Sequence, residues 1–69
     1  MTVTKEELFA LLSEIFSNYS VRGELTNFEK KVFTFVTSKI SLDCYYMSKE
    51  FKEASRLTQF GFEAFLDDN

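Results

Sequence analysis

The chain has 69 residues with a formal net charge of -3, and it contains one cysteine but no histidine, proline or tryptophan. A chain of this length supports one domain and buries only about 60% of its unfolded surface. The content of hydrophobic residues is 45%, which is typical of globular rather than disordered proteins. An internal disulfide is excluded and a zinc site is disfavoured, so we expect no metal and no cofactor. Stability must then come from dense packing, self-association or a larger partner.

Cellular location is indicated by three features of the sequence. Cys44 is a lone thiol, which favours a reducing compartment. The N-terminus lacks the charged and then apolar pattern of a signal peptide. No apolar run approaches the ~18 residues that a membrane span requires. We therefore expect a cytoplasmic protein without a membrane segment.

The first predicted helix covers residues 4–19. Thr4 and Glu7 have the spacing of a capping box, in which each side chain bonds the other residue's backbone N–H. Residues 20–25 form the predicted connection, and Gly23 is suited to a positive φ there. The apolar residues of the helix follow helical spacing: Leu8, Leu11, Leu12, Ile15, Phe16 and Tyr19.

The second predicted helix covers residues 26–41 and begins with a second capping box, Thr26 and Glu29. Several β-branched residues lie in 32–37, and that segment alone would also suit a strand. We favour a helix because no partner strand is evident and a lone strand leaves its backbone unpaired. The predicted core stripe consists of Phe28, Val32, Phe35, Val36 and Ile40.

The third predicted helix covers residues 48–66, after a break between Ser41 and Ser48 that no glycine or proline marks. We expect Gly61 to weaken or kink this helix. Acidic side chains are unfavourable at the negative end of a helix dipole, so the helix should end near residue 65 or 66, before Asp67 and Asp68. The sequence therefore predicts an all-α domain over residues 1–69, a small three-helix bundle, with a dimer left open.

Catalytic chemistry has little support in the sequence. Cys44 has no histidine to act as its base. Glu50 and Glu53 share a helix face, but lysine and arginine surround them, which is typical of a solvated surface. We predict that the chain is not an enzyme.

Interaction with another protein is the leading functional hypothesis. Phe9 and Phe33 lie at the margins of their apolar stripes, and Phe60 lies roughly opposite the apolar side of its helix. One or more of these side chains should be exposed and contact a partner or a second copy, although a core that wraps around the third helix would also explain them. The chain would then be a small regulator or inhibitor that occupies a surface of a larger protein, like many products of short genes in phages and mobile elements.

The alternative hypothesis is a DNA-binding regulator. Residues 25–33 resemble the opening helix of a helix-turn-helix domain, and the reading helix would present Lys49, Lys52 and Arg56. The net charge of -3 opposes this hypothesis, as do the glutamates among those bases. Residues 25–58 are mildly basic, with six Lys or Arg against four Asp or Glu, which keeps nucleic acid as a minor possibility.

Overall fold

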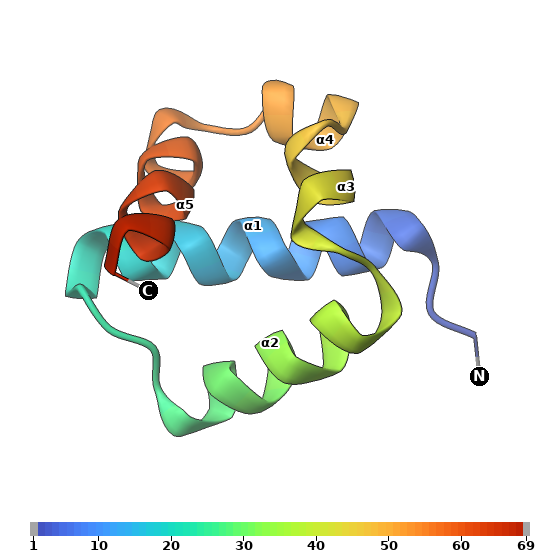
Figure 1. The fold of residues 1–69 in the computed structure, drawn as a ribbon, viewed down its shortest axis with the longest axis horizontal. Coiled ribbons are helices and arrows are strands. Elements are labelled where there is room, and N and C mark those ends of the chain that lie inside the picture. The colour runs from blue at the N-terminus through green and yellow to red at the C-terminus, as the bar shows by residue number, and fades with distance from the viewer. Residues whose placement is uncertain (1, 69) are drawn as a thin grey trace.

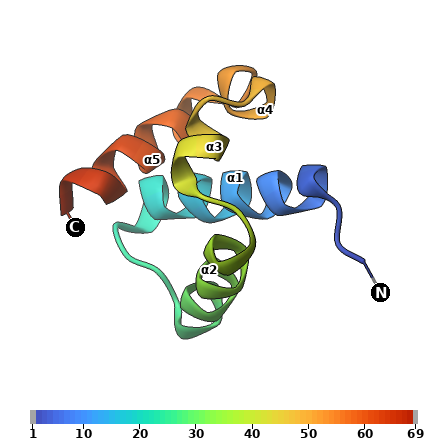
Figure 2. The same cartoon turned by 45° about the vertical axis from the view of Figure 1, so that its right-hand side comes forward.

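A computed structural model describes residues 2–68, which form five α-helices and no strand. The prediction of an all-α fold is confirmed, but five helices replace the three that were expected. Helix α1 runs through the middle of the molecule, with α2 on one side and α3 to α5 on the other (Figures 1 and 2). The helices are α1 (Lys5–Arg22), α2 (Asn27–Lys39), α3 (Leu42–Tyr46), α4 (Lys49–Lys52) and α5 (Arg56–Asp68).

Both predicted capping boxes are present. Thr4 caps α1 and Thr26 caps α2, and in each box the glutamate three residues later bonds back to the threonine N–H. Helix α1 continues past the predicted end at residue 19, because its last turn closes on Gly23. This glycine has the expected positive φ of 81°, and its N–H donates to the Tyr19 carbonyl.

Residues 32–37 are helical throughout, so the strand alternative for this segment is wrong. Their threonines are accommodated by bonding back to the preceding turn. The hydroxyl of Thr34 donates to the Lys30 carbonyl, and that of Thr37 donates to the Phe33 carbonyl, each at 2.9 Å. The helix ends at Lys39, before the extended backbone of Ile40.

The predicted third helix is divided in two, and a further short helix occupies the predicted break. Serines explain this division, because each accepts a hydrogen bond from the N–H three residues ahead and so begins a new helix. The N–H to Oγ distances are 3.1 Å at Ser41, 3.0 Å at Ser48 and 3.2 Å at Ser55. The Gln59 amide then donates to the Phe51 carbonyl at 3.0 Å and to the Lys52 carbonyl at 3.3 Å, which links the start of α5 to the end of α4.

The acidic end of the chain is helical as far as Asp68, so the expected end at residue 65 or 66 is wrong. The Tyr19 hydroxyl donates to the Asp68 carboxylate and ties the last turn of α5 to α1. This hydrogen bond, together with burial and the carboxylate charge, raises the pKa of Tyr19. A tertiary contact thus offsets the unfavourable dipole.

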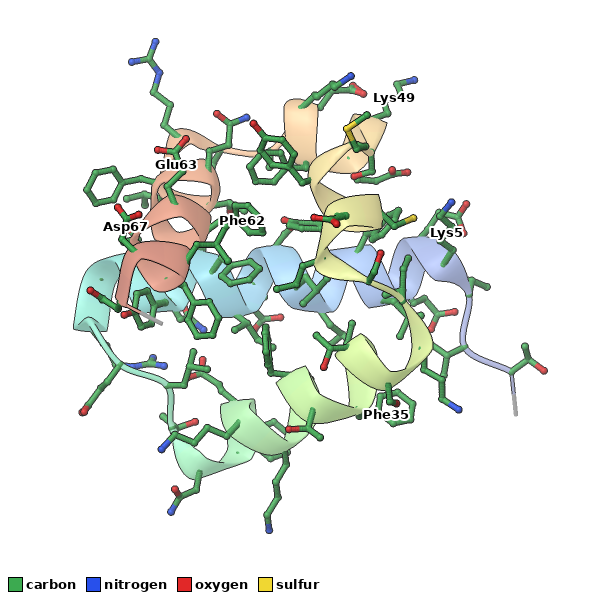
Figure 3. All side chains as sticks on the ribbon, viewed as in Figure 1. Lys5, Phe35, Lys49, Phe62, Glu63 and Asp67 are labelled. Atoms are coloured by element: carbon green, nitrogen blue, oxygen red, sulfur yellow. The ribbon has the colours of Figure 1, made fainter. Side chains whose placement is uncertain are left out.

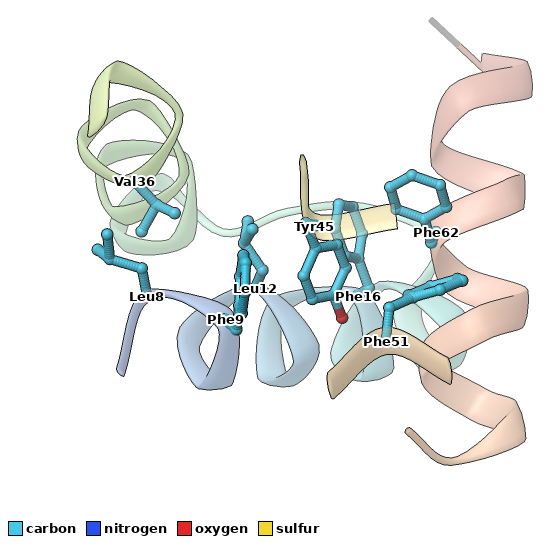
Figure 4. Packing of buried hydrophobic residues seen from close by; sticks show 8 residues of the cluster. All are labelled: Leu8, Phe9, Leu12, Phe16, Val36, Tyr45, Phe51 and Phe62. Atoms are coloured by element: carbon cyan, nitrogen blue, oxygen red, sulfur yellow. The ribbon is translucent and has the colours of Figure 1, made fainter. Parts of the chain in front are cut away.

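The core gathers around Tyr45, which is fully buried although it lies in the predicted break. The centroid of its ring lies 5.6 Å from the ring centroid of Phe9, 6.0 Å from that of Phe16 and 5.2 Å from that of Phe51. The hydroxyl is 2.7 Å from Ser13 Oγ, and burial raises the pKa of Tyr45. Figure 4 shows the buried cluster, which consists of Leu8, Phe9, Leu12, Phe16, Val36, Tyr45, Phe51 and Phe62.

Helix α5 crosses α1 at Gly61. A Cβ atom at this position would lie 1.9 Å from the Phe16 carbonyl oxygen, far inside van der Waals contact. The Thr58 hydroxyl, one turn earlier, donates to the Ser13 carbonyl at 3.2 Å. The absence of a side chain at Gly61 therefore allows the backbones of α5 and α1 to approach each other closely.

Candidate interaction surfaces

A polar cluster around Glu29 fixes the rotation of α2 against α1. Glu29 is 9% exposed, and its carboxylate accepts from the Thr26 N–H at 2.9 Å and from the Asn18 amide at 3.1 Å. It also forms an ion pair with Arg22. The Thr26 N–H contributes most to holding the pKa of Glu29 below its ordinary value, with smaller effects from Asn18 and the Arg22 charge, while burial acts in the opposite direction.

This rotation turns part of the predicted core stripe of α2 outward. Residues on the side of Glu29 approach α1, and among them Val36 is fully buried and Phe33 is half-buried. Phe28 is 74% exposed and Phe35 is 44% exposed, so the expectation that both are core residues is wrong. Helix α2 carries two apolar stripes, and only one of them can face α1.

The outward stripe of α2 and the adjacent side of α1 form a continuous surface, which we call the α1–α2 groove. Three adjoining hollows compose it: the first two share Val3 and Phe35, and the last two share Leu11 and Glu14. Figure 3 shows Phe35 on the outer part of α2. The groove has the apolar residues Val3, Leu11, Phe28, Val32 and Phe35, with Glu7 and Glu14 along the edge of α1.

The groove was not predicted from the sequence, because all apolar residues of the α2 stripe were expected in the core. The available signal was a surplus of apolar positions. The stripe at 28, 32 and 35 and the stripe at 33, 36 and 40 together are too wide for one contact with one neighbouring helix.

The three phenylalanines predicted as contact residues have different environments. Phe9 is 1% exposed and packs on Tyr45, so the expectation of a surface position is wrong for it. Phe33 packs against Phe16 and Phe65, with ring centroids 6.1 and 5.1 Å apart, and contributes to the core. Phe60 is 64% exposed and therefore lies at the surface.

Phe60 belongs to a second apolar surface, which we call the α5 patch and define as Leu57, Phe60 and Ala64. These residues are spaced by three and four positions, which places them on one face of α5. Leu57 is 52% exposed and Ala64 is half-buried. The described structure brings neither Phe9 nor Phe33 to this patch, because both pack into the interior.

The basic residues of the DNA-binding alternative do not share a helix. Lys49 and Lys52 lie in the single turn of α4, whereas Arg56 begins α5. Lys49 Nζ is 3.8 Å from the Glu53 carboxylate, an exposed pair. The continuous reading helix that this hypothesis requires is absent from residues 48–66.

Reactive groups are scattered. Cys44 is half-buried on α3, while Glu50 and Glu53 are exposed. Across residues 2–68, no three cysteine, aspartate or glutamate side chains are grouped to hold a metal ion. Over the same residues, no helix combines the length and apolar character that crossing a bilayer demands.

These features define a small all-α domain of five helices with two exposed apolar surfaces. Comparisons with protein-family models, with curated proteins and with solved structures found no match to the chain. The function must therefore be argued from the surfaces themselves.

The Glu29 cluster leads to a pH-dependent prediction. Glu29→Gln keeps the shape of the side chain but removes its charge beside Arg22, so we expect a loss of about 1–2 kcal/mol in the free energy of unfolding at pH 7. Folding lowers the pKa of Glu29, so the stabilisation by the ionised carboxylate is complete at pH values above its pKa in the unfolded chain. It disappears as the pH falls through its pKa in the folded chain. Urea titrations of both proteins should converge only once the pH falls below the lowered pKa of Glu29 in the folded chain.

Glu7→Gln is the matched control. Glu7 occupies the same position in the capping box of α1, but it is exposed and forms no ion pair with another described residue. Its substitution should cost no more than about 0.5 kcal/mol. Equal losses from the two substitutions would show that the Arg22 and Asn18 contacts contribute nothing.

Proposed function

We propose that this chain is a small non-catalytic protein-binding domain that regulates or inhibits a larger protein by occupying one of its surfaces. The main support is Phe60, a large aromatic side chain that is 64% exposed on a helix fixed to the core. Aromatic side chains contribute disproportionately to protein interfaces.

The packing of α5 against α1 supports this proposal. Gly61 brings the helix backbone against α1, and Phe62 inserts into the core with 3% exposure. Figure 4 shows the Phe62 ring beside Tyr45, Phe16 and Phe51, while in Figure 3 Glu63 and Asp67 lie on the outer side of α5. Phe60 is thus presented on a rigid element, which lowers the entropy lost on binding. The nearby carboxylates favour a partner with basic residues around an apolar contact.

Phe60→Ser tests this proposal. Because the ring is mostly exposed, we expect its removal to change the free energy of unfolding by less than about 0.5 kcal/mol. Partners captured by the immobilised wild-type chain from a lysate of its source organism are identified by mass spectrometry and purified. Their affinity for the variant, measured by calorimetry, should be at least about tenfold weaker.

Phe62→Ser is the control for folding, because this neighbour is buried against Phe16 at 5.1 Å between ring centroids. It should strongly destabilise the chain. A folded Phe60→Ser variant that binds the purified partner with unchanged affinity would show that the α5 patch is not the contact surface. Failure of the wild-type chain to bind any purified candidate would contradict the function itself.

Self-association is part of the same proposal. A chain of 69 residues has limited surface to bury by itself, and exposed apolar residues on a folded domain commonly mark contacts with another chain. The α1–α2 groove and the α5 patch lie on different helices, so one copy could present both surfaces at once.

A further inference from the structure

We propose that the α1–α2 groove is the interface of a two-fold symmetric dimer, in which α1 of each copy lies over α2 of the other. This inference rests on the self-association included above and names its surface, symmetry and charge pairs. The occupant of the groove is a second copy of this chain. The α5 patch remains free for a larger partner.

The two helices of the groove run in opposite directions and are inclined to each other (Figures 1 and 2), and the residues that line each hollow show which parts of α1 and α2 lie at the same level. At one end, Leu11 and Glu14 line the same hollow as Phe28 and Val32. Toward the other end, Val3 and Glu7 share a hollow with Phe35. Figure 1 shows α1 and α2 running in opposite directions. A two-fold axis parallel to the groove brings residues at the same level of the two copies together. It also places the α1 edge of each copy opposite the α2 edge of the other.

The two edges of the groove carry opposite charges. Glu7 and Glu14 lie on the α1 edge. Lys31 is exposed, three residues after Phe28 and four before Phe35, at the outer margin of the apolar stripe. Among the described residues, neither Glu14 nor Lys31 forms an ion pair within its own chain.

In the proposed dimer, acidic side chains of one copy lie at the same level as basic side chains of the other. Glu14 lies at the level of Phe28 and Val32, so it faces Lys31 of the second copy. Glu7 lies at the level of Phe35, next to which Lys39 Nζ sits 5.6 Å from the ring centroid. By symmetry each contact occurs twice, and a surface with one acidic and one basic edge is complementary to itself.

The area available indicates a weak dimer. Helix α2 has 13 residues, a length of about 20 Å, and two adjacent helices are about 20 Å wide. The footprint is then roughly 400 Å² per copy, or about 800 Å² in total, which is below the ~1,200 Å² of standard specific interfaces and in the range of weak, transient contacts. We therefore expect reversible association with a dissociation constant in the micromolar range or weaker.

Sedimentation of the purified chain tests this interface. Between about 5 and 500 μM the wild-type chain should shift from monomer to dimer. Phe28→Ser should weaken the dimer at least about tenfold and remain folded, because its ring is 74% exposed. Phe60→Ser should dimerise like the wild type, which separates this interface from the α5 patch. A wild-type chain that stays monomeric throughout this range would overturn the proposal.

Charge reversal tests the pairing more sharply. Glu14→Lys or Lys31→Glu alone places like charges opposite each other at both pairs, so each variant should be a monomer at concentrations where the wild type is a dimer. Mixing the two variants restores both pairs and should yield a heterodimer. Salt at about 500 mM should reduce that recovery.

Lys30→Glu is the matched control for charge. It makes the same change in net charge one residue away, at a position outside the lining of the groove. It should dimerise like the wild type. A heterodimer with Glu14→Lys has one Glu14–Lys31 pair and one contact between two lysines, so this mixture should form far less heterodimer than the mixture of Glu14→Lys with Lys31→Glu. If Lys30→Glu behaves like Lys31→Glu in both assays, the proposed pairing is wrong and attraction arises from net charge alone.

Discussion

Replacing Gly61 with alanine is expected to lower the free energy of unfolding by about 3 kcal/mol or more. The new Cβ would meet the Phe16 carbonyl oxygen at 1.9 Å, and a backbone atom inside a helix cannot rotate out of the way as a side chain can. Helix α5 would have to move bodily away from α1. That movement would loosen Phe62 and the hydrogen bond from Thr58 to the Ser13 carbonyl.

Helix propensity alone predicts the opposite sign for this substitution, a gain of about 1 kcal/mol from replacing a helical glycine with alanine. Urea denaturation followed by circular dichroism would distinguish the expected loss of stability from the expected gain. Gly23→Ala is the comparison, because no atom beyond its two chain neighbours lies within 4 Å of the new Cβ and only the φ of 81° opposes the substitution. That substitution should cost about 1 kcal/mol. Stabilisation by Gly61→Ala would mean that α5 does not cross α1 here.

Tyr45→Ala is the second large effect, and we expect it to cost about 3–5 kcal/mol. The side chain is fully buried and its ring contacts aromatic residues from α1, α4 and α5, so truncation leaves a cavity at the meeting point of these helices. A domain of this size has a total stability of roughly 3–10 kcal/mol. The variant should therefore be largely unfolded or molten at room temperature.

Two further variants divide the contribution of Tyr45 between its ring and its hydroxyl. Tyr45→Phe keeps the ring and removes the hydrogen bond to Ser13, for an expected cost of about 1 kcal/mol. Tyr46→Ala removes the adjacent tyrosine, which is 51% exposed and stacks on Phe62, and should cost much less than Tyr45→Ala. Near-ultraviolet circular dichroism and thermal unfolding would rank the three variants. Equal losses at positions 45 and 46 would contradict the central place of Tyr45.

Local signals predicted the first half of the chain well. The two capping boxes mark the starts of α1 and α2, and Gly23 closes α1. These features depend on hydrogen bonds between residues close in sequence, so they can be read from a short window. The segment after residue 40 was predicted less well, because serines served both as surface residues and as helix starts. A serine becomes a cap only when the chain turns there, and here Gln59 also bonds back to the carbonyls of Phe51 and Lys52.

The candidate surfaces also could be predicted only in part from the sequence. Phe60 could be expected at the surface because it lies opposite the apolar side of its helix. Phe9 was expected at the surface but is buried, and Phe28 was expected in the core but is exposed. Helical spacing ranks positions around one helix, but it does not say how many neighbouring helices cover it. Helix α1 is covered on two sides, whereas α2 meets its neighbours along one side.

The sequence by itself determined the helical character, the starts of the two long helices and the need for an aromatic core. It did so because periodicity and capping act over a few residues. Only the tertiary structure decided which stripe of α2 faces inward, that the third predicted helix is divided, and that Gly61 serves as a crossing point. Each of these depends on residues far apart in the chain, through Glu29 with Asn18 and Arg22, Gln59 with Phe51, and Gly61 with Phe16.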